Sequence, residues 1–259
     1  MSFCIVAHAR AGLLQPQVQP AVVPRTGQPL RRAGMHASLA LLACTDVLAH
    51  EQQAGLALPP ACPTALLWHS VQGQQQETEA LLAAQREGDG LLLPFDFLAS
   101  QPSLLCTHLQ PWLPGLAQTL FLPGTAHPHE QLWLQALQLA DVWLAQGRFQ
   151  RVICASLERQ PKEMCQYAAI SLVADTQPLP ATCQAEAVYG RWQRQAVMPG
   201  MEPGRLQGAG HAPAAGGATG GAVADAALWR MLEGTAGQAA TLPGPVASLH
   251  LRRAAATVA

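Results

Sequence analysis

Residues 119–157 read TLFLPGTAHPHEQLWLQALQLADVWLAQGRFQRVICASL and contain an apolar run, a helical pattern and a second apolar run. Thr119 to Leu122 predicts a short strand, and Glu130 to Gln146 predicts a helix that is apolar on nearly every side and therefore packed between layers. Arg151 to Leu157 predicts a second strand, whose unbroken apolar character is typical of a parallel strand covered on both faces. The order strand, helix, strand predicts a layered α/β fold.

The rest of the chain carries patterns of the same kind. Thr64 to Ser70 has the length and apolarity of a buried strand, and a helical pattern over 76–87 follows it. The other predicted elements are a strand at 3–7, a helix at 36–50, a strand at 167–174, a helix at 223–233 and a strand at 246–251.

Prolines and glycines mark two irregular segments. Pro16, Pro20, Pro24 and Pro29 follow the first predicted strand. Because proline lacks an amide hydrogen and clashes with the preceding helical turn, we expect an extended surface connection there rather than a helix. Residues 198–222 are rich in glycine and proline, and we expect them to be irregular or mobile.

Composition limits the classes of function. The 259 residues are 49% hydrophobic and 12% charged, so the chain is expected to bury a substantial core rather than to be disordered. The formal net charge of -1 provides no broad positive field for a polyphosphate. This composition argues against a nucleic-acid partner.

Cysteine usage and apolar runs bear on the compartment. The seven cysteines are scattered without a C-x-x-C pair, which predicts buried, reduced thiols instead of a disulfide framework or a zinc site. No apolar run reaches the length of a membrane span, and no basic leader precedes Phe3 to Ala7. We therefore expect a cytoplasmic protein without a membrane span.

One segment resembles the "SPF…S…N…GHL" stretch of the β-ketoacyl synthases: residues 90–109, GLLLPFDFLASQPSLLCTHL. Other features of that family follow in the same order. Thr125-Ala126 resembles the start of the family's Thr-Ala-Cys step, and the apolar helix, Gly147-Arg148 and the strand at 152–155 come next. Upstream, residues 30–32 (LRR) resemble the "RRMS" step of these proteins. The resemblance covers roughly residues 1 to 190.

This resemblance implies an α/β, thiolase-like (ketosynthase-like) layered fold, truncated relative to a full ketosynthase. A full ketosynthase has two such halves, and this chain resembles the short, single-half proteins described as chain-length factors of aryl-polyene or type II polyketide systems. We expect one domain over 1–259, with a flexible segment at 190–222 and a terminal helix and strand within 223–259. Leu228-Trp229 and the arginine-ended run 249–253 (LHLRR) fit the family's C-terminal pattern.

The nucleophile of this family is missing. A ketosynthase holds its acyl chain as a thioester on a cysteine at the start of a helix, where the helix dipole favours the thiolate. Counting forward from the strand at 119–122 places His127 at that position, and counting back from Gly147 places Glu130 there. Neither side chain forms a thioester, so we expect no catalytic residue and no cofactor in this chain.

The resemblance then implies a silent subunit that pairs with an active ketosynthase and works on chains carried by an acyl carrier protein. It implies that the strand Thr119, Leu120, Phe121 and Leu122 packs across the dimer axis. It also implies that Phe97, Gln101, Leu104 and Leu105 line the partner's tunnel and limit chain extension.

Two alternatives stay open. The chain can be an independent enzyme in which His127, His129 and Glu130 act as bases or metal ligands, since imidazole and carboxylate suit zinc. It can also be a docking scaffold for the carrier protein, with no influence on chain length. Arg31 and Arg32 are candidates for contact with an acidic carrier protein.

Overall fold

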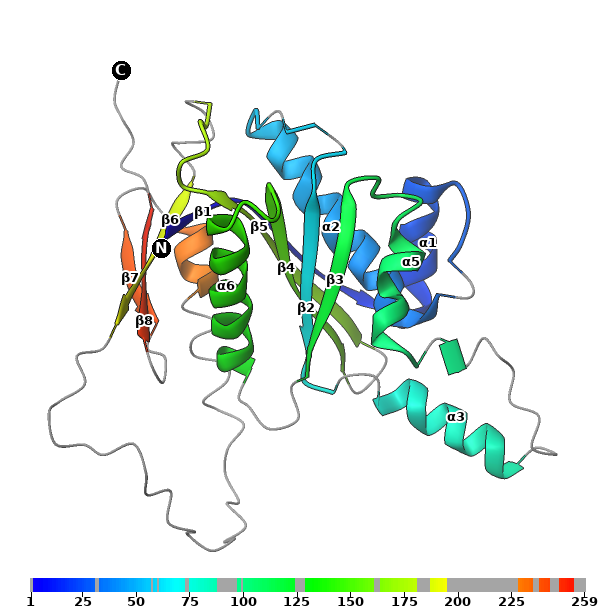
Figure 1. The fold of residues 1–259 in the computed structure, drawn as a ribbon. Coiled ribbons are helices and arrows are strands. Elements are labelled where there is room, and N and C mark those ends of the chain that lie inside the picture. The colour runs from blue at the N-terminus through cyan, green and yellow to red at the C-terminus, as the bar shows by residue number, and fades with distance from the viewer. Residues whose placement is uncertain are drawn as a thin grey trace, which may run out of the picture.

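The fold is described from a computed structural model, drawn in Figure 1. It describes residues 2–30, 33–56, 58–59, 61–72, 75–87, 97–98, 100–123, 129–160, 164–180, 187–194, 228–234, 238–242 and 247–253. Residues 198–222, where we expect an irregular segment, lie outside this part of the chain.

The eight strands described form one mixed sheet in the order β3-β2-β4-β5-β1-β6-β8-β7. Neighbours β3, β2 and β4 are parallel, and the remaining pairs are antiparallel. The strands are β1 (Ser2–Leu14), β2 (Thr64–Ser70), β3 (Leu116–Pro123), β4 (Arg151–Gln160), β5 (Met164–Ala174), β6 (Val188–Arg194), β7 (Ala239–Leu242) and β8 (Ala247–Arg253). The six predicted strands are confirmed, whereas β6 and β7 are additions.

Helices cover both faces of the sheet, which confirms the layered α/β prediction (Figure 1). One face carries α1, α2 and α5, and the other carries α6 and a helical turn at 228–233. The helices are α1 (Gln15–Thr26), α2 (Gly34–Gln53), α3 (Gln75–Glu87), the 3-10 turn η1 (Pro102–Leu104), α5 (Leu105–Leu109) and α6 (His129–Ala145). No described helix combines the length and apolar character that crossing a membrane requires.

The centre of the sheet follows from the two apolar stretches. Every residue of β2 is buried, because β3 and β4 flank it and helices pack on both of its faces. The helix α6 packs against the sheet through Leu137 and Trp143, and its Trp133 ring meets Trp229 at 6.3 Å. The prediction that this helix lies between layers is confirmed.

The proline-rich segment is a helix, so the expectation of an extended connection was wrong. Pro16, Pro20 and Pro24 recur every fourth residue and are exposed, whereas Val18 and Val22 have the same spacing and are buried. The amide hydrogens that the prolines lack therefore fall along one solvent-facing row, where water satisfies the freed carbonyls. Burial of the valine row then decides the conformation.

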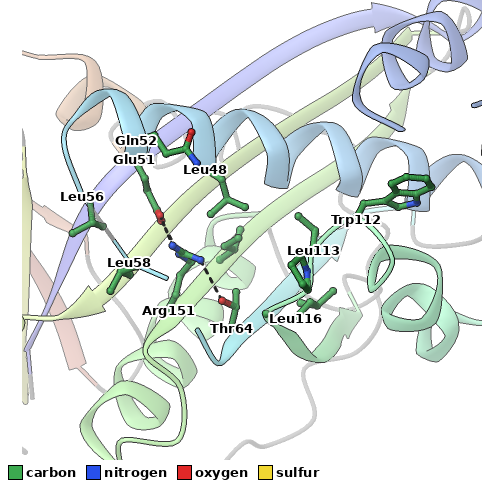
Figure 2. Close-up of a pocket in the computed structure, with 13 residues that line it drawn as sticks. Leu48, Glu51, Gln52, Leu56, Leu58, Thr64, Trp112, Leu113, Leu116 and Arg151 are labelled. Carbon is green, nitrogen blue, oxygen red and sulfur yellow. Dashed lines mark hydrogen bonds and ion pairs between the residues drawn. The ribbon is translucent and has the colours of Figure 1, made fainter. Parts of the chain in front are cut away.

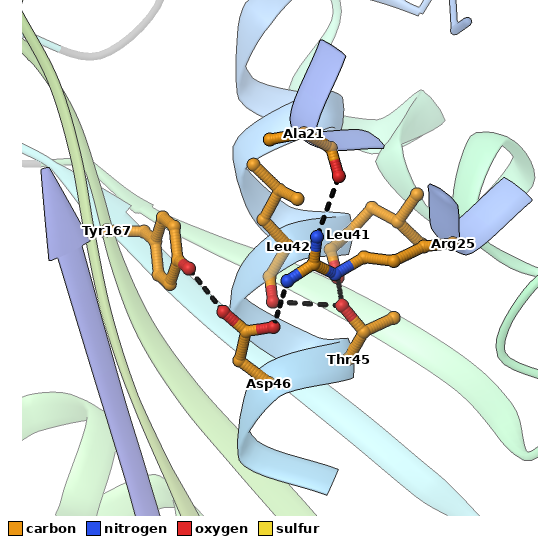
Figure 3. A network of polar contacts seen from close by, with 7 residues as sticks. All are labelled: Ala21, Arg25, Leu41, Leu42, Thr45, Asp46 and Tyr167. Atoms are coloured by element: carbon orange, nitrogen blue, oxygen red, sulfur yellow. Dashed lines mark hydrogen bonds and ion pairs between the residues drawn. The ribbon is translucent and has the colours of Figure 1, made fainter. Parts of the chain in front are cut away.

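A polar network attaches α1 to the rest of the molecule (Figure 3). Arg25 forms an ion pair with Asp46 of α2, and its Nη1 donates to the Ala21 carbonyl at 2.7 Å. The Tyr167 hydroxyl of β5 donates to the other oxygen of Asp46. One carboxylate thus joins two helices to the sheet.

A second ion pair lies deeper in the molecule. Arg151, the first residue of β4, donates from Nε and Nη2 to the two oxygens of Glu51 at 3.0 and 2.7 Å, and both side chains are buried. The Ser171 hydroxyl of β5 also donates to Glu51, and Arg151 Nη1 donates to Thr64 Oγ1 at 3.4 Å. This cluster connects the last turn of α2 to three adjacent strands.

The close packing of β6 on β1 gives a test of this core. A Cβ added at Gly190 would lie 2.3 Å from Cζ of the fully buried Phe3 ring. We predict that Gly190→Ala lowers the free energy of unfolding by about 1–3 kcal/mol through overpacking, measured by urea denaturation.

Gly12→Ala is the matched control in the same sheet, because its Cβ would meet Met164 at an ordinary 3.7 Å. We expect this variant to change the free energy of unfolding by less than about 1 kcal/mol. Equal effects of the two substitutions would contradict the proposed packing of Phe3 on Gly190.

Candidate functional site

The strand β3 forms an edge of the sheet. Among the described residues it pairs with β2 alone, and its side chains from Thr119 to Leu122 are only half-buried. Phe121 packs on the core beneath α2, whereas Leu120 and Leu122 pack on the core beneath α6. The side chains of β3 thus pack within this chain. The main-chain N–H and C=O groups on the outer side of β3 form an edge that another strand can pair with.

The segment predicted to line a tunnel lies beside this edge. Both η1 and α5 contact β3. Leu105 and Leu109 lie four residues apart and are buried in the core, which fixes the orientation of the short helix. Gln101 and Leu104 remain half-buried. The structure therefore places η1, which ends at Leu104, next to the predicted interface strand, and Gln101 directly precedes η1.

A turn of helix before η1 exposes two large apolar side chains. Phe97 is 51% exposed and Leu98 is 37% exposed. The carbonyls of these residues accept hydrogen bonds from the amides of Ser100 and Gln101, at 3.1 Å each, so the turn leads directly into η1. Both side chains are therefore exposed beside η1.

Aromatic rings support the edge from inside. The Phe121 ring lies 4.4 Å from that of Trp68 on β2, and Trp68 lies 5.5 Å from the ring of His36 in the first turn of α2. Trp68 and His36 are buried. This stack ties the edge strand to β2 and α2, so the edge is expected to be rigid.

A buried polar pair, not foreseen from the sequence, lies where β2 ends. His36 Nδ1 and Glu77 Oε1 are 3.4 Å apart, and both side chains are nearly buried. Burial opposes the charge on Glu77, but the facing His36 side chain outweighs this effect, and the pKa of this carboxyl is lowered. The pair joins the first turns of α2 and α3.

The chain is also fixed as it leaves β2. Glu158 of β4 accepts a hydrogen bond from the Ser70 hydroxyl at 3.1 Å and another from the Val71 amide at 2.8 Å. These residues stand at the carboxyl ends of two adjacent parallel strands. The connection toward α3 therefore begins from a defined position.

The sequence offered one signal for the His36–Glu77 pair, namely a histidine and a glutamate in the first turns of two predicted helices.

The two cysteines that flank β3 and α6 in the sequence, Cys106 and Cys154, are poor nucleophiles. Burial raises the pKa of Cys154 and also that of Cys106 in α5. The six cysteines that the structure describes are unpaired by disulfides, and five of them are buried, as predicted from their scattered positions. Within the described part of the chain, no group of three or more histidine, cysteine or acidic residues could hold a metal ion.

Several predicted site residues lie outside the described residues. His127 belongs to the undescribed segment between β3 and α6, and the side chains of His129 and Glu130 are also outside the description. Arg31 and Arg32 precede α2 in another such segment. Their roles stay predictions.

No protein-family model matches this sequence, and no curated protein sequence matches it. Solved structures similar in fold include chains from ketosynthase complexes and OleA from Xanthomonas campestris. A chain from the complex of the ketosynthase ApeO with its chain length factor ApeC from Xenorhabdus doucetiae is 15% identical, with a TM-score of 0.47, over 86% of this chain and 79% of that chain.

Two further structures give comparable values. The match with the ishigamide ketosynthase/chain length factor is 10% identical, with a TM-score of 0.49, over 74% of this chain and 67% of that chain. A chain from AntDE:AntF, a type II acyl-carrier protein in complex with its ketosynthase, is 13% identical, with a TM-score of 0.45, over 67% of this chain and 63% of that one. All three TM-scores lie below 0.5, and at these identities the similarity concerns the fold alone.

The His36–Glu77 pair predicts a pH-dependent stability. A carboxyl whose pKa falls on folding adds stability above its unfolded pKa, and this contribution is lost as the pH drops through the folded pKa. We expect Glu77→Gln to lower the free energy of unfolding at neutral pH by about 1 kcal/mol, and the deficit to shrink on acidification.

Glu79→Gln on the same helix is the control, because Glu79 is exposed. Urea denaturation of both variants at neutral and acidic pH makes the comparison. A deficit for Glu77→Gln that is the same at both pH values would show that the charge of Glu77 is not its cause.

Proposed function

We propose that this chain is a non-catalytic, chain-length-factor-like subunit that pairs with an active β-ketoacyl synthase in type II polyketide or polyene biosynthesis. It acts in the cytoplasm on chains held by an acyl carrier protein. The observation that carries the proposal is the open, half-exposed edge strand β3, with Gln101 and Leu104 beside it. The order of ketosynthase-like motifs in the sequence supports it.

The edge suits pairing with a second sheet. The alternating side chains of β3 already pack on the two cores of this chain, so an incoming strand would be held mainly by main-chain hydrogen bonds. The stack of Phe121, Trp68 and His36 keeps that edge in one conformation. A preformed edge loses little conformational entropy when the partner binds.

The exposed apolar turn extends the contact beyond the strand. Phe97 and Leu98 face solvent in the isolated chain, and a partner surface would cover them. Gln101 and Leu104 then stand between the core of this chain and the partner. Their bulk limits the space for a growing acyl chain, which is how a subunit without its own nucleophile controls product length.

The cysteine pattern supports a silent role. A thioester requires a thiolate, and no cysteine occurs between Cys106 and Cys154, the interval that contains β3 and α6. Burial raises the pKa of both flanking thiols, which keeps them protonated. In this proposal the partner supplies the nucleophile, and Arg31 and Arg32 contact the acidic carrier protein.

The first test addresses the edge. Co-expression with a ketosynthase from the same gene neighbourhood is expected to give a stable 1:1 complex on size-exclusion chromatography. Thr119→Lys places a charge on β3 and is expected to weaken the complex at least about tenfold. Thr176→Lys, in the exposed turn after β5, is the matched control, because β2 and β4 separate β5 from β3.

A monodisperse monomer that ignores the ketosynthase would refute the pairing. Covalent attachment of a radiolabelled acyl group to this chain would refute the silent role.

The second test addresses chain length. In the complex, Leu104→Phe is expected to shift the products toward shorter chains and Leu104→Ala toward longer ones, because the side chain occupies space beside the interface. Mass spectrometry of the products measures the shift, with Leu82→Phe on the exposed face of α3 as the control. A plain docking scaffold would leave the product distribution unchanged in all three variants.

A further inference from the structure

A small cavity lies at the end of the sheet where β2 and β4 begin, at the other end of these strands from the His36–Glu77 pair (Figure 2). Its volume is about 150 Å³. The last turns of α2, the segment after that helix and the turn before β3 enclose it. Its lining combines a buried ion pair with a largely leucine wall.

The polar side chains of the lining are those of Glu51, Gln52, Thr64 and Arg151. Glu51 and Arg151 are both more than nine-tenths buried, and their charges compensate each other at 2.7 Å. The guanidinium has more N–H groups than the three that Glu51 and Thr64 engage among the described residues. It therefore retains donors for a further acceptor at this wall.

The apolar part of the lining strengthens any hydrogen bond that Arg151 donates to a bound molecule. Figure 2 shows Leu48, Leu113 and Leu116 on one side of the ion pair, and Leu56 and Leu58 on its other side. In surroundings of low polarity a hydrogen bond is stronger than in water, and an unpaired charge is costly.

We propose that this cavity binds a small, uncharged molecule of about the size of a benzene ring that carries one hydrogen-bond acceptor. The volume fits a ring of that size. The acceptor takes a spare N–H of Arg151, and the ring contacts the leucines. An anion would be repelled by Glu51, and a cation would be repelled by Arg151, so a neutral ligand is favoured over either.

This site is independent of the proposed pairing at the outer edge of β3, and it can be tested on the full chain alone. The probes are cyclohexanone, cyclohexanecarboxylate and cyclohexylammonium, which share a ring and differ in charge. Titration followed by protein-detected NMR is expected to show saturable binding of the ketone, with shifts at residues lining the cavity. The two charged probes are expected to bind at least about tenfold more weakly.

Two variants fill the cavity from half-buried positions, Leu58→Trp and Leu48→Phe, so that one remains informative if the other fails to fold. Each is expected to abolish binding of cyclohexanone, whereas Leu82→Trp on exposed α3 leaves it unchanged. Absence of saturable binding, equal binding of a charged probe, or unchanged binding to both folded filled variants would overturn the proposal.

Discussion

The buried ion pair between Glu51 and Arg151 is the constraint on which the positions of the main elements depend. It joins the end of α2 to the start of β4, and hydrogen bonds with Thr64 and Ser171 extend it to β2 and β5. Burial raises the pKa of Glu51, and only the charge and hydrogen bonds of its partners oppose that cost. Loss of one member of such a pair typically costs about 3–5 kcal/mol, because the other charge stays buried.

The ion pair and its hydrogen bonds fix one end of α2 and of the strands β2, β4 and β5, and this also determines the positions of their opposite ends. The first turn of α2 brings His36 onto Trp68, and Trp68 holds Phe121 of the edge strand. The same turn places His36 beside Glu77, which positions the start of α3. A continuous series of packed groups thus connects the buried ion pair to the exposed edge. This rigidity is the property that the proposed pairing of β3 with a partner requires.

The elements that could be predicted from the sequence are those whose conformation and burial depend little on tertiary contacts. β2 and β4 each contain an unbroken apolar run, at 65–68 and 152–155, and α6 has apolar residues on almost every side, so their burial follows from composition alone. The helix α1 was missed because proline content argues against a helix, and only the buried row of Val18 and Val22 overrides it. β7 has four residues, and its strand character depends on pairing with β8.

The sequence by itself determined the layered α/β order, the lack of a cysteine between Cys106 and Cys154 and the apolar character of Leu120 and Leu122. Tertiary structure decided which of these residues meet and which stay exposed. Glu51 and Arg151 are 100 positions apart, and neither carries a local signal of burial. A charge is stable in the interior only beside its partner, and that pairing exists only once helix and sheet have come together.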